Sequence, residues 1–162
     1  MPHKTLIALV LAGASLSVQA GECEDNFAKT GSAFSGVDFS SRVSVPQLSV
    51  ADALGQVRGI MVSEKMDVIT EDPAGGVMLV EQRSDGATRA IPTLINVSAS
   101  GDAASVQMTI KTEKGQFAKA DAMRGYLCDL LSRVKGGEAG RLAGAQGAKA
   151  QNAADVTVKD VY

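Results

Sequence analysis

The chain has 162 residues and a formal net charge of −2, and 4% of its residues are aromatic, with no tryptophan. Because lysine and arginine are not in excess, this composition argues against a nucleic-acid partner, and the scarcity of aromatic rings argues against base-stacking or sugar-stacking surfaces. Histidine occurs once, at position 3.

The first 20 residues have the pattern of a cleaved secretory signal peptide. Lys4 supplies a positive charge, residues 6–11 are apolar, and Val18-Gln19-Ala20 has the small-x-small form that signal peptidase recognises. The apolar run is shorter than the roughly 20 residues that span a bilayer, so we expect cleavage after Ala20 and no membrane-spanning anchor. The mature protein is then expected in the periplasm or outside the cell, and loss of Lys4 gives it a net charge of −3.

The chain contains two cysteines, Cys23 and Cys128. An even number of cysteines in an exported chain predicts one disulfide, which would tie the mature N-terminus to a late helix. The enclosed loop of about 105 residues corresponds to roughly 4 to 5 kcal/mol as an upper figure in the entropy model. The alternatives are two separate thiols or a metal site, and two thiolates without histidine fall short of a structural zinc site.

The first half of the chain predicts a strand and a helix. Residues 21–36 are small and polar, and we expect them to form a strap fixed by Cys23. Residues 37–45 alternate between apolar and polar, which predicts a half-buried strand. Ser49 is a candidate N-cap for a helix of about fifteen residues, whose apolar residues recur at spacings of three and four.

The second half predicts further strands and a closing helix. Residues 66–70, 77–83, 88–98 and 105–111 have strand character and are separated by turns, which is typical of an antiparallel meander. Pro92 indicates an edge position or a late start for the third of these strands. A leucine-rich helix is expected between Gly115 and Gly136, and residues 136–162, rich in Ala and Gly, are predicted to be a flexible or marginally helical tail.

Residues 37–135 are therefore expected to form a single α+β domain. It would contain an antiparallel sheet of four to five strands, with two helices packed on one face, in the order β-α-β-β-β-β-α. The opposite sheet face, which carries Asp38, Arg42, Gln107 and Lys111, is expected to meet water or a partner. The oligomeric state stays open.

The same stretch resembles the helix-grip domains of bacterial envelope proteins, and among them the family of the C-terminal domain of outer-membrane assembly lipoprotein C. The likeness is carried by VSVPQLSVADALGQVRGIMVSEKMDVITEDPAGGVMLVEQR and VQMTIKTEKGQFAKADAMRGYLCDLL, as a pattern of strand, proline, helix, strands and closing helix. The resemblance implies a non-enzymatic binding or scaffolding module. That family is lipid-anchored, whereas this chain has no cysteine directly after the expected cleavage point, so no functional residue is carried over.

Catalytic chemistry is poorly supported by the residues. Without His3 the mature chain has no histidine, which removes Ser-His and Cys-His catalysis and histidine-ligated metals. Ser132 and Lys135 form a Ser-x-x-Lys pair, but at the end of a helix, whereas enzymes place the serine at a helix start. Glu71 and Asp72 adjoin a Pro-Gly turn and fit solvated loop residues better than glycosidase carboxylates. We therefore predict a protein that is not an enzyme and has no metal or cofactor.

Two functions are compatible with these patterns, and the sequence favours the first. The first is a protein-binding or scaffold module whose partner, another envelope protein, docks on the open sheet face or pairs with an edge strand near residues 88–98. The second is a carrier of a small ligand or lipid, with a pocket between the closing helix and the sheet lined by Val57, Met108, Leu127 and Leu131. The competing interpretation of the second is that these four side chains pack on one another.

Overall fold

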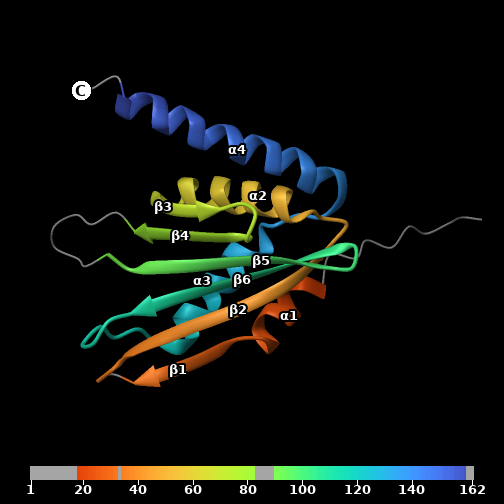
Figure 1. Cartoon of the computed structure of the whole chain (residues 1–162). Helices are drawn as coiled ribbons and strands as arrows, with labels where there is room; N and C mark the ends of the chain where they lie inside the picture. The colour runs from red at the N-terminus through yellow and green to blue at the C-terminus, as the bar shows by residue number, and fades with distance from the viewer. Residues whose placement is uncertain (1–17, 33, 83–89, 160–162) are drawn as a thin grey trace, which may run out of the picture.

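The computed structural model describes residues 18–32, 34–82 and 90–159, and the side chains among them from residue 21 to residue 150. One antiparallel sheet has the strand order β1-β2-β6-β5-β4-β3 (Figure 1). Its strands are β1 Ala28–Ser32, β2 Gly36–Pro46, β3 Met66–Asp72, β4 Val77–Gln82, β5 Pro92–Ser100 and β6 Ala103–Thr112. The helices are α1 Val18–Asp25, α2 Val50–Ser63, α3 Ala120–Ser132 and α4 Gly137–Lys159.

The predicted α+β class is confirmed, but the structure has more strands and more helices than expected. The described segments hold six strands and four helices, where the sequence predicted four to five strands and two helices. The expected strap over residues 21–36 contains most of α1 and all of β1. Every residue of β1 is exposed, so this edge strand lacks the alternation of apolar and polar residues that predicts a strand from sequence.

The sheet buries one face, as the alternation in the sequence predicted. In β2 the buried side holds Val37, Phe39, Val43 and Val45. The antiparallel partner β6 continues this face, with Ile110 opposite Phe39 and Val106 opposite Val43. The opposite face carries the polar side chains, and there Lys111 of β6 pairs with Asp38 of β2.

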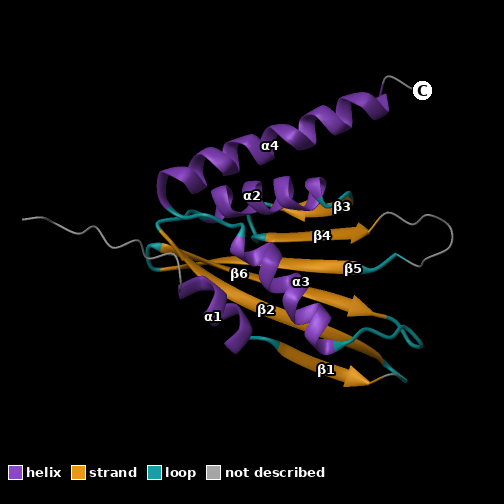
Figure 2. Ribbon diagram, turned by 180° about the vertical axis from the view of Figure 1, so that it is seen from behind, coloured by secondary structure: helices purple, strands orange, loops and turns teal. Residues whose placement is uncertain are grey.

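Helices α2 and α3 pack on the buried face of the sheet (Figure 2). The predicted N-cap of α2 is confirmed, because the hydroxyl oxygen of Ser49 accepts a hydrogen bond from the backbone N–H of Asp52 at 3.1 Å. Each helix contributes an apolar stripe to one continuous core: Leu54, Val57 and Met61 come from α2, and Leu127, Leu130 and Leu131 come from α3.

The strand expected at an edge is an interior strand. β5 lies between β4 and β6, so its backbone is already paired on both sides, and the edges of the sheet are β1 and β3. Residues 88 and 89 lie outside the described residues. The late strand start indicated by Pro92 is confirmed, because β5 begins at that residue.

Residues 137–159, which were expected to be flexible or marginally helical, form the helix α4. This helix runs along α2 (Figure 1), and the two backbones approach closely at glycines. A Cβ atom added to Gly55 of α2 would lie 2.3 Å from the carbonyl oxygen of Gly144, and one added to Gly147 would lie 1.8 Å from that of Gly55. The Gly- and Ala-rich composition therefore permits close backbone packing in a segment with few large apolar side chains.

The connection between α3 and α4 is fixed by a buried amide. Gln56 of α2 is 4% exposed. Its side-chain nitrogen donates to the carbonyl oxygen of Lys135 at 2.9 Å, and its side-chain oxygen accepts from the N–H of Lys135 at 2.8 Å. Both polar ends of the buried side chain are thus satisfied by the connecting backbone.

Cys23 of α1 and Cys128 of α3 form a disulfide, as the cysteine count predicted, and their Cα atoms are 5.6 Å apart. The hydroxyl of Ser41 in β2 donates to the carbonyl oxygen of Cys23, and Phe27 stacks on Phe39 with ring centroids 6.4 Å apart. The N-terminal segment is therefore held to both α3 and the sheet.

The predicted signal peptide lies mostly outside the described residues. Residues 1–17 are not described, and residues 18–20 begin α1. Cleavage after Ala20 stays a prediction. It would leave residues 21–25 of α1 in the mature protein, attached to α3 through the disulfide of Cys23. Among the helices of the described segments, none is both long and apolar enough to cross a bilayer.

We expect Gly147→Ala to lower the free energy of unfolding by about 1 to 3 kcal/mol, because its Cβ would clash with the backbone of α2. Gly125→Ala is the matched control: it lies in α3, its added Cβ would meet nothing within 4 Å, and we expect it to stabilise by up to about 1 kcal/mol. Urea unfolding of both variants measures the difference. Equal stability of the two variants would show that α4 does not pack on α2.

Reduction of the disulfide should lower the free energy of unfolding by up to roughly 4 to 5 kcal/mol, because the loop that it closes becomes free in the unfolded state. The check is denaturant unfolding with and without reductant, with thiol labelling to prove reduction. A variant with both Cys23→Ala and Cys128→Ala should unfold like the reduced protein and should not respond to reductant. An unchanged transition after proven reduction would contradict this expectation.

Candidate functional site

A pocket of about 600 Å³ opens between α3 and the sheet. It lies where α2 ends and α3 begins, and Figure 2 shows the two helices diverging toward this end of the sheet. α2 stops at Ser63, and Lys65, whose φ of 60° is left-handed, turns the chain into β3. The divergence leaves the ends of the central strands without a helix directly over them.

The floor of the pocket continues the buried face of the sheet. Thr93 of β5 lies opposite Ile110 of β6, and both line the pocket. Met66 of β3 and Ile91, just before β5, extend this floor toward the edge of the sheet. The lining is therefore mainly apolar at its base.

The roof and mouth come from α3 and the loop before it. Met123 and Tyr126 face the pocket from the first half of α3, and Gln116, Phe117 and Ala118 line it from the loop. Phe117 is 85% exposed, which is unusual for a large aromatic side chain and places a ring at the pocket mouth.

Two of the polar lining groups are already used within the protein. The hydroxyl of Thr112 donates to the carbonyl oxygen of Val37 at 2.9 Å and accepts from the N–H of Val37 at 3.1 Å. The side-chain oxygen of Gln116 accepts from the N–H of Glu113 at 2.7 Å. These contacts hold β6 and the following loop in place.

Two lining hydroxyls have no such role. Among the described residues, neither the Thr93 hydroxyl nor the Tyr126 hydroxyl has a hydrogen-bond partner. No fully buried side-chain oxygen or nitrogen among the described residues lacks a partner, so each hydroxyl keeps some accessible surface where its residue lines the pocket, although Thr93 is only 2% exposed. They lie on opposite walls, one on the sheet and one on α3.

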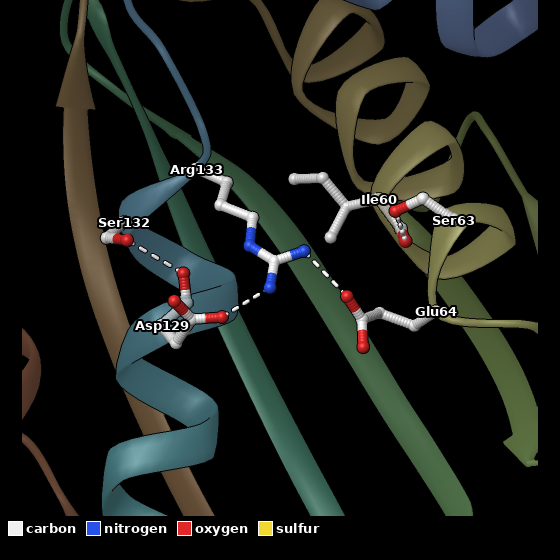
Figure 3. Close-up of polar contacts among 6 residues, drawn as sticks. All are labelled: Ile60, Ser63, Glu64, Asp129, Ser132 and Arg133. Atoms are coloured by element: carbon white, nitrogen blue, oxygen red, sulfur yellow. Dashed lines mark hydrogen bonds and ion pairs between the residues drawn. The ribbon is translucent and has the colours of Figure 1, made fainter.

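An ion-pair bridge connects the two helices beside the pocket (Figure 3). Arg133, the residue after α3, donates from Nη1 to the carboxylate of Glu64 at 2.6 Å and from Nη2 to the carboxylate of Asp129. The hydrogen bonds to Glu64 and then to Asp129 raise the pKa of Arg133. Because Glu64 directly follows α2, the bridge links the end of α2 to the end of α3. Its groups are partly exposed, so solvent screens both ion pairs and we expect little stability from either.

Tyr126 occupies an environment that opposes its ionisation. Burial is the main cause that raises the pKa of Tyr126 above 10.0, and the negative charge of Glu64 raises it further. The positive charge of Arg133 acts in the opposite direction but does not reverse the shift. The phenol therefore remains a protonated hydrogen-bond donor throughout the physiological range.

The four residues predicted to line a pocket lie in the core instead. Val57, Met108, Leu127 and Leu131 are each 0% exposed, and none of them lines the pocket. They pack on one another and on their neighbours, as the competing interpretation of the sequence expected. The pocket lies farther along the same gap, toward the start of α3. The signal that could have placed it is a pair of threonines, Thr93 and Thr112, at core-facing strand positions.

The side chains considered for catalysis have structural partners. The hydroxyl of Ser132 donates to the carbonyl oxygen of Asp129 at 2.7 Å, and Nζ of Lys135 donates to the carbonyl oxygen of Ser132 at 2.9 Å. Glu71 pairs with Arg58, and Asp72 accepts hydrogen bonds from the backbone of the turn that follows it. Each of these groups stabilises a local structure.

Within the described segments, no three His, Cys, Asp or Glu side chains gather closely enough to hold a metal ion. Comparison with known proteins adds no assignment: no protein-family model matches the chain, and no curated protein matches its sequence. The pocket is therefore the feature of the molecule that bears on function.

We expect Tyr126 to titrate above pH 10.0 in the folded protein. The chain contains two tyrosines, so subtracting the tyrosinate absorbance of a Tyr126→Phe variant isolates this group. A raised folded-state pKa contributes stability that is complete below the unfolded-state pKa and is lost as the pH rises through the folded-state value. The variant should lack this alkaline loss of stability. A titration midpoint at or below 10.0 would contradict the described environment.

Proposed function

We propose that this protein is an exported, non-enzymatic binding protein that holds a small, mainly apolar ligand between α3 and the sheet. The pocket carries this proposal, since its volume of about 600 Å³ falls within the roughly 300 to 1,000 Å³ typical of small-molecule sites. Its apolar base and its few polar groups are also typical of such sites.

The chemistry of the lining supports binding over catalysis. Glu64 and Tyr126 are the titratable side chains among the described lining residues. Glu64 is held by Arg133, and Tyr126 stays protonated near neutral pH. A general base that is both free and ionised, which hydrolysis or proton abstraction would need, is therefore not provided by these two groups.

Export is part of the proposal and is supported by two observations. The first 20 residues have a signal-peptide pattern, and the disulfide between Cys23 and Cys128 is typical of an oxidising compartment. The proposed likeness to helix-grip envelope domains fits the same arrangement, in which two helices cover one face of an antiparallel sheet.

The pocket also favours the second of the two functions that the sequence left open. Docking of an envelope protein was expected on the open sheet face or at an edge strand near residues 88–98, and the second of these routes is blocked because β5 is already paired on both sides. The pocket, in contrast, is lined by the closing helix and the sheet, the elements between which a carrier pocket was expected. Ligand binding is therefore the function that the geometry supports best.

The test is binding of diphenylhexatriene, an uncharged hydrocarbon dye that fluoresces in apolar surroundings. We expect the wild-type protein to bind it and Ala118→Phe to bind it at least about tenfold more weakly, because the added ring occupies pocket volume. Ala122→Phe is the matched control, since Ala122 is an exposed residue of α3 that does not line the pocket. It should bind like the wild type.

Two outcomes would overturn this proposal. One is the absence of dye binding by the wild-type protein, and the other is equal binding by Ala118→Phe and Ala122→Phe. Native mass spectrometry of the protein purified from its own host extends the test. We expect a co-purifying small molecule that Ala118→Phe does not retain.

A further inference from the structure

We infer that the pocket selects an uncharged amphiphile, which is an apolar molecule with one neutral hydrogen-bonding group, over a carboxylate or an ammonium of the same shape. This inference rests on the proposed function, because it names the ligand class of the same pocket. It is carried by the placement of the charged and uncharged polar groups around the lining.

Carboxylates are disfavoured because the lining offers them no positive charge. Among the described lining residues, Glu64 is the one with a formal charge, and that charge is negative. An anion buried among Met66, Ile91 and Ile110 would lose its hydration without gaining a cationic partner.

Ammonium groups are disfavoured because the negative charge of Glu64 is already paired. Nη1 of Arg133 lies 2.6 Å from the Glu64 carboxylate. A ligand cation would have to compete with this guanidinium, which is also bound to Asp129. The gain from meeting Glu64 would therefore be offset by the loss of an existing charge-assisted hydrogen bond.

A neutral polar group has uncharged partners in the lining. The hydroxyls of Thr93 and Tyr126 face the pocket from opposite walls without a described partner, and the amide of the exposed Gln82 also lines it. The hydroxyl of Thr112 and the side-chain oxygen of Gln116 are bonded to the backbone. A hydroxyl can accept or donate, so the pair suits an alcohol, ester, amide or ketone group. Filling the pocket with a pure hydrocarbon would leave both hydroxyls unsatisfied, which adds to the cost of desolvating them.

The test compares three ligands that share one chain and differ in charge: decanol, decanoate and decylammonium. Each displaces diphenylhexatriene from the wild-type protein near neutral pH, and the dye reports pocket occupancy without hydrogen bonding. We expect decanol to displace the dye at a concentration at least about tenfold lower than either ion. Displacement by decanoate or decylammonium at an equal or lower concentration would overturn the inference.

The variants Tyr126→Phe and Thr93→Val remove one hydroxyl each and keep a similar side-chain shape. We expect at least one of them to weaken decanol binding by about five- to tenfold, since a hydrogen bond to the ligand is lost. Either variant should bind diphenylhexatriene at least as tightly as the wild type, because the substitution removes a hydroxyl that the hydrocarbon dye leaves unsatisfied, and this binding shows that the pocket is intact. Unchanged decanol binding by both variants would overturn the role given to the hydroxyls.

The variant Arg133→Met tests the charge argument in the opposite direction. It releases the carboxylate of Glu64 from its partner, so decylammonium should bind more tightly than to the wild type while decanol is unaffected. Unchanged decylammonium binding would contradict the role of the bridge. Failure of the dye to bind the wild-type protein is a separate result, because it overturns the proposed function and this inference together.

Discussion

Burial of a single face of the sheet is the constraint on which the rest of the molecule depends. The apolar residues of β2 and β6 lie on one side, so both large core helices must pack there. Each helix is also held from outside the core. α4 packs along α2 through backbone contacts at glycines, and the disulfide from α1 holds α3. The sheet determines which of its faces is covered. The contact of α4 with α2 and the disulfide from α1 to α3 then hold the two covering helices in place.

The pocket follows from the way in which these two helices cover the sheet. They approach each other at one end, where Gln56 binds the backbone of Lys135, and they diverge at the other. Close packing fills the gap where they are near, with Val57 and Leu127 fully buried. Where they are apart, the strand ends remain uncovered, and the side chains there include two threonines and a tyrosine. The cavity is therefore placed by the angle between helices that are otherwise well packed.

The elements with a clear periodicity were predictable from the sequence. Period two in residues 37–45 and 105–111 placed β2 and β6, apolar spacing and Ser49 placed α2, and the two cysteines indicated their own pairing. β1 was missed because all of its residues are exposed, so no alternation marks it. The segment of α4 was expected to be flexible or marginally helical because it offers few apolar residues to bury, and only the tertiary contact with α2 shows that its glycines permit close backbone packing.

The pocket residues were harder to predict, because they come from β3, β4, β5, β6, α3 and the loop before it. No local pattern in the sequence indicates how α2 and α3 cross the sheet. The four residues predicted to line the pocket lie instead in the core, where the two helices are close together. The disulfide has a further consequence for an exported chain. Cys23 precedes Cys128 by 105 residues, so under the proposed export of an unfolded chain the first thiol would reach an oxidising compartment long before its partner. The native cross-link would then form only after most of the domain had been translocated, which would make oxidation a late step of maturation.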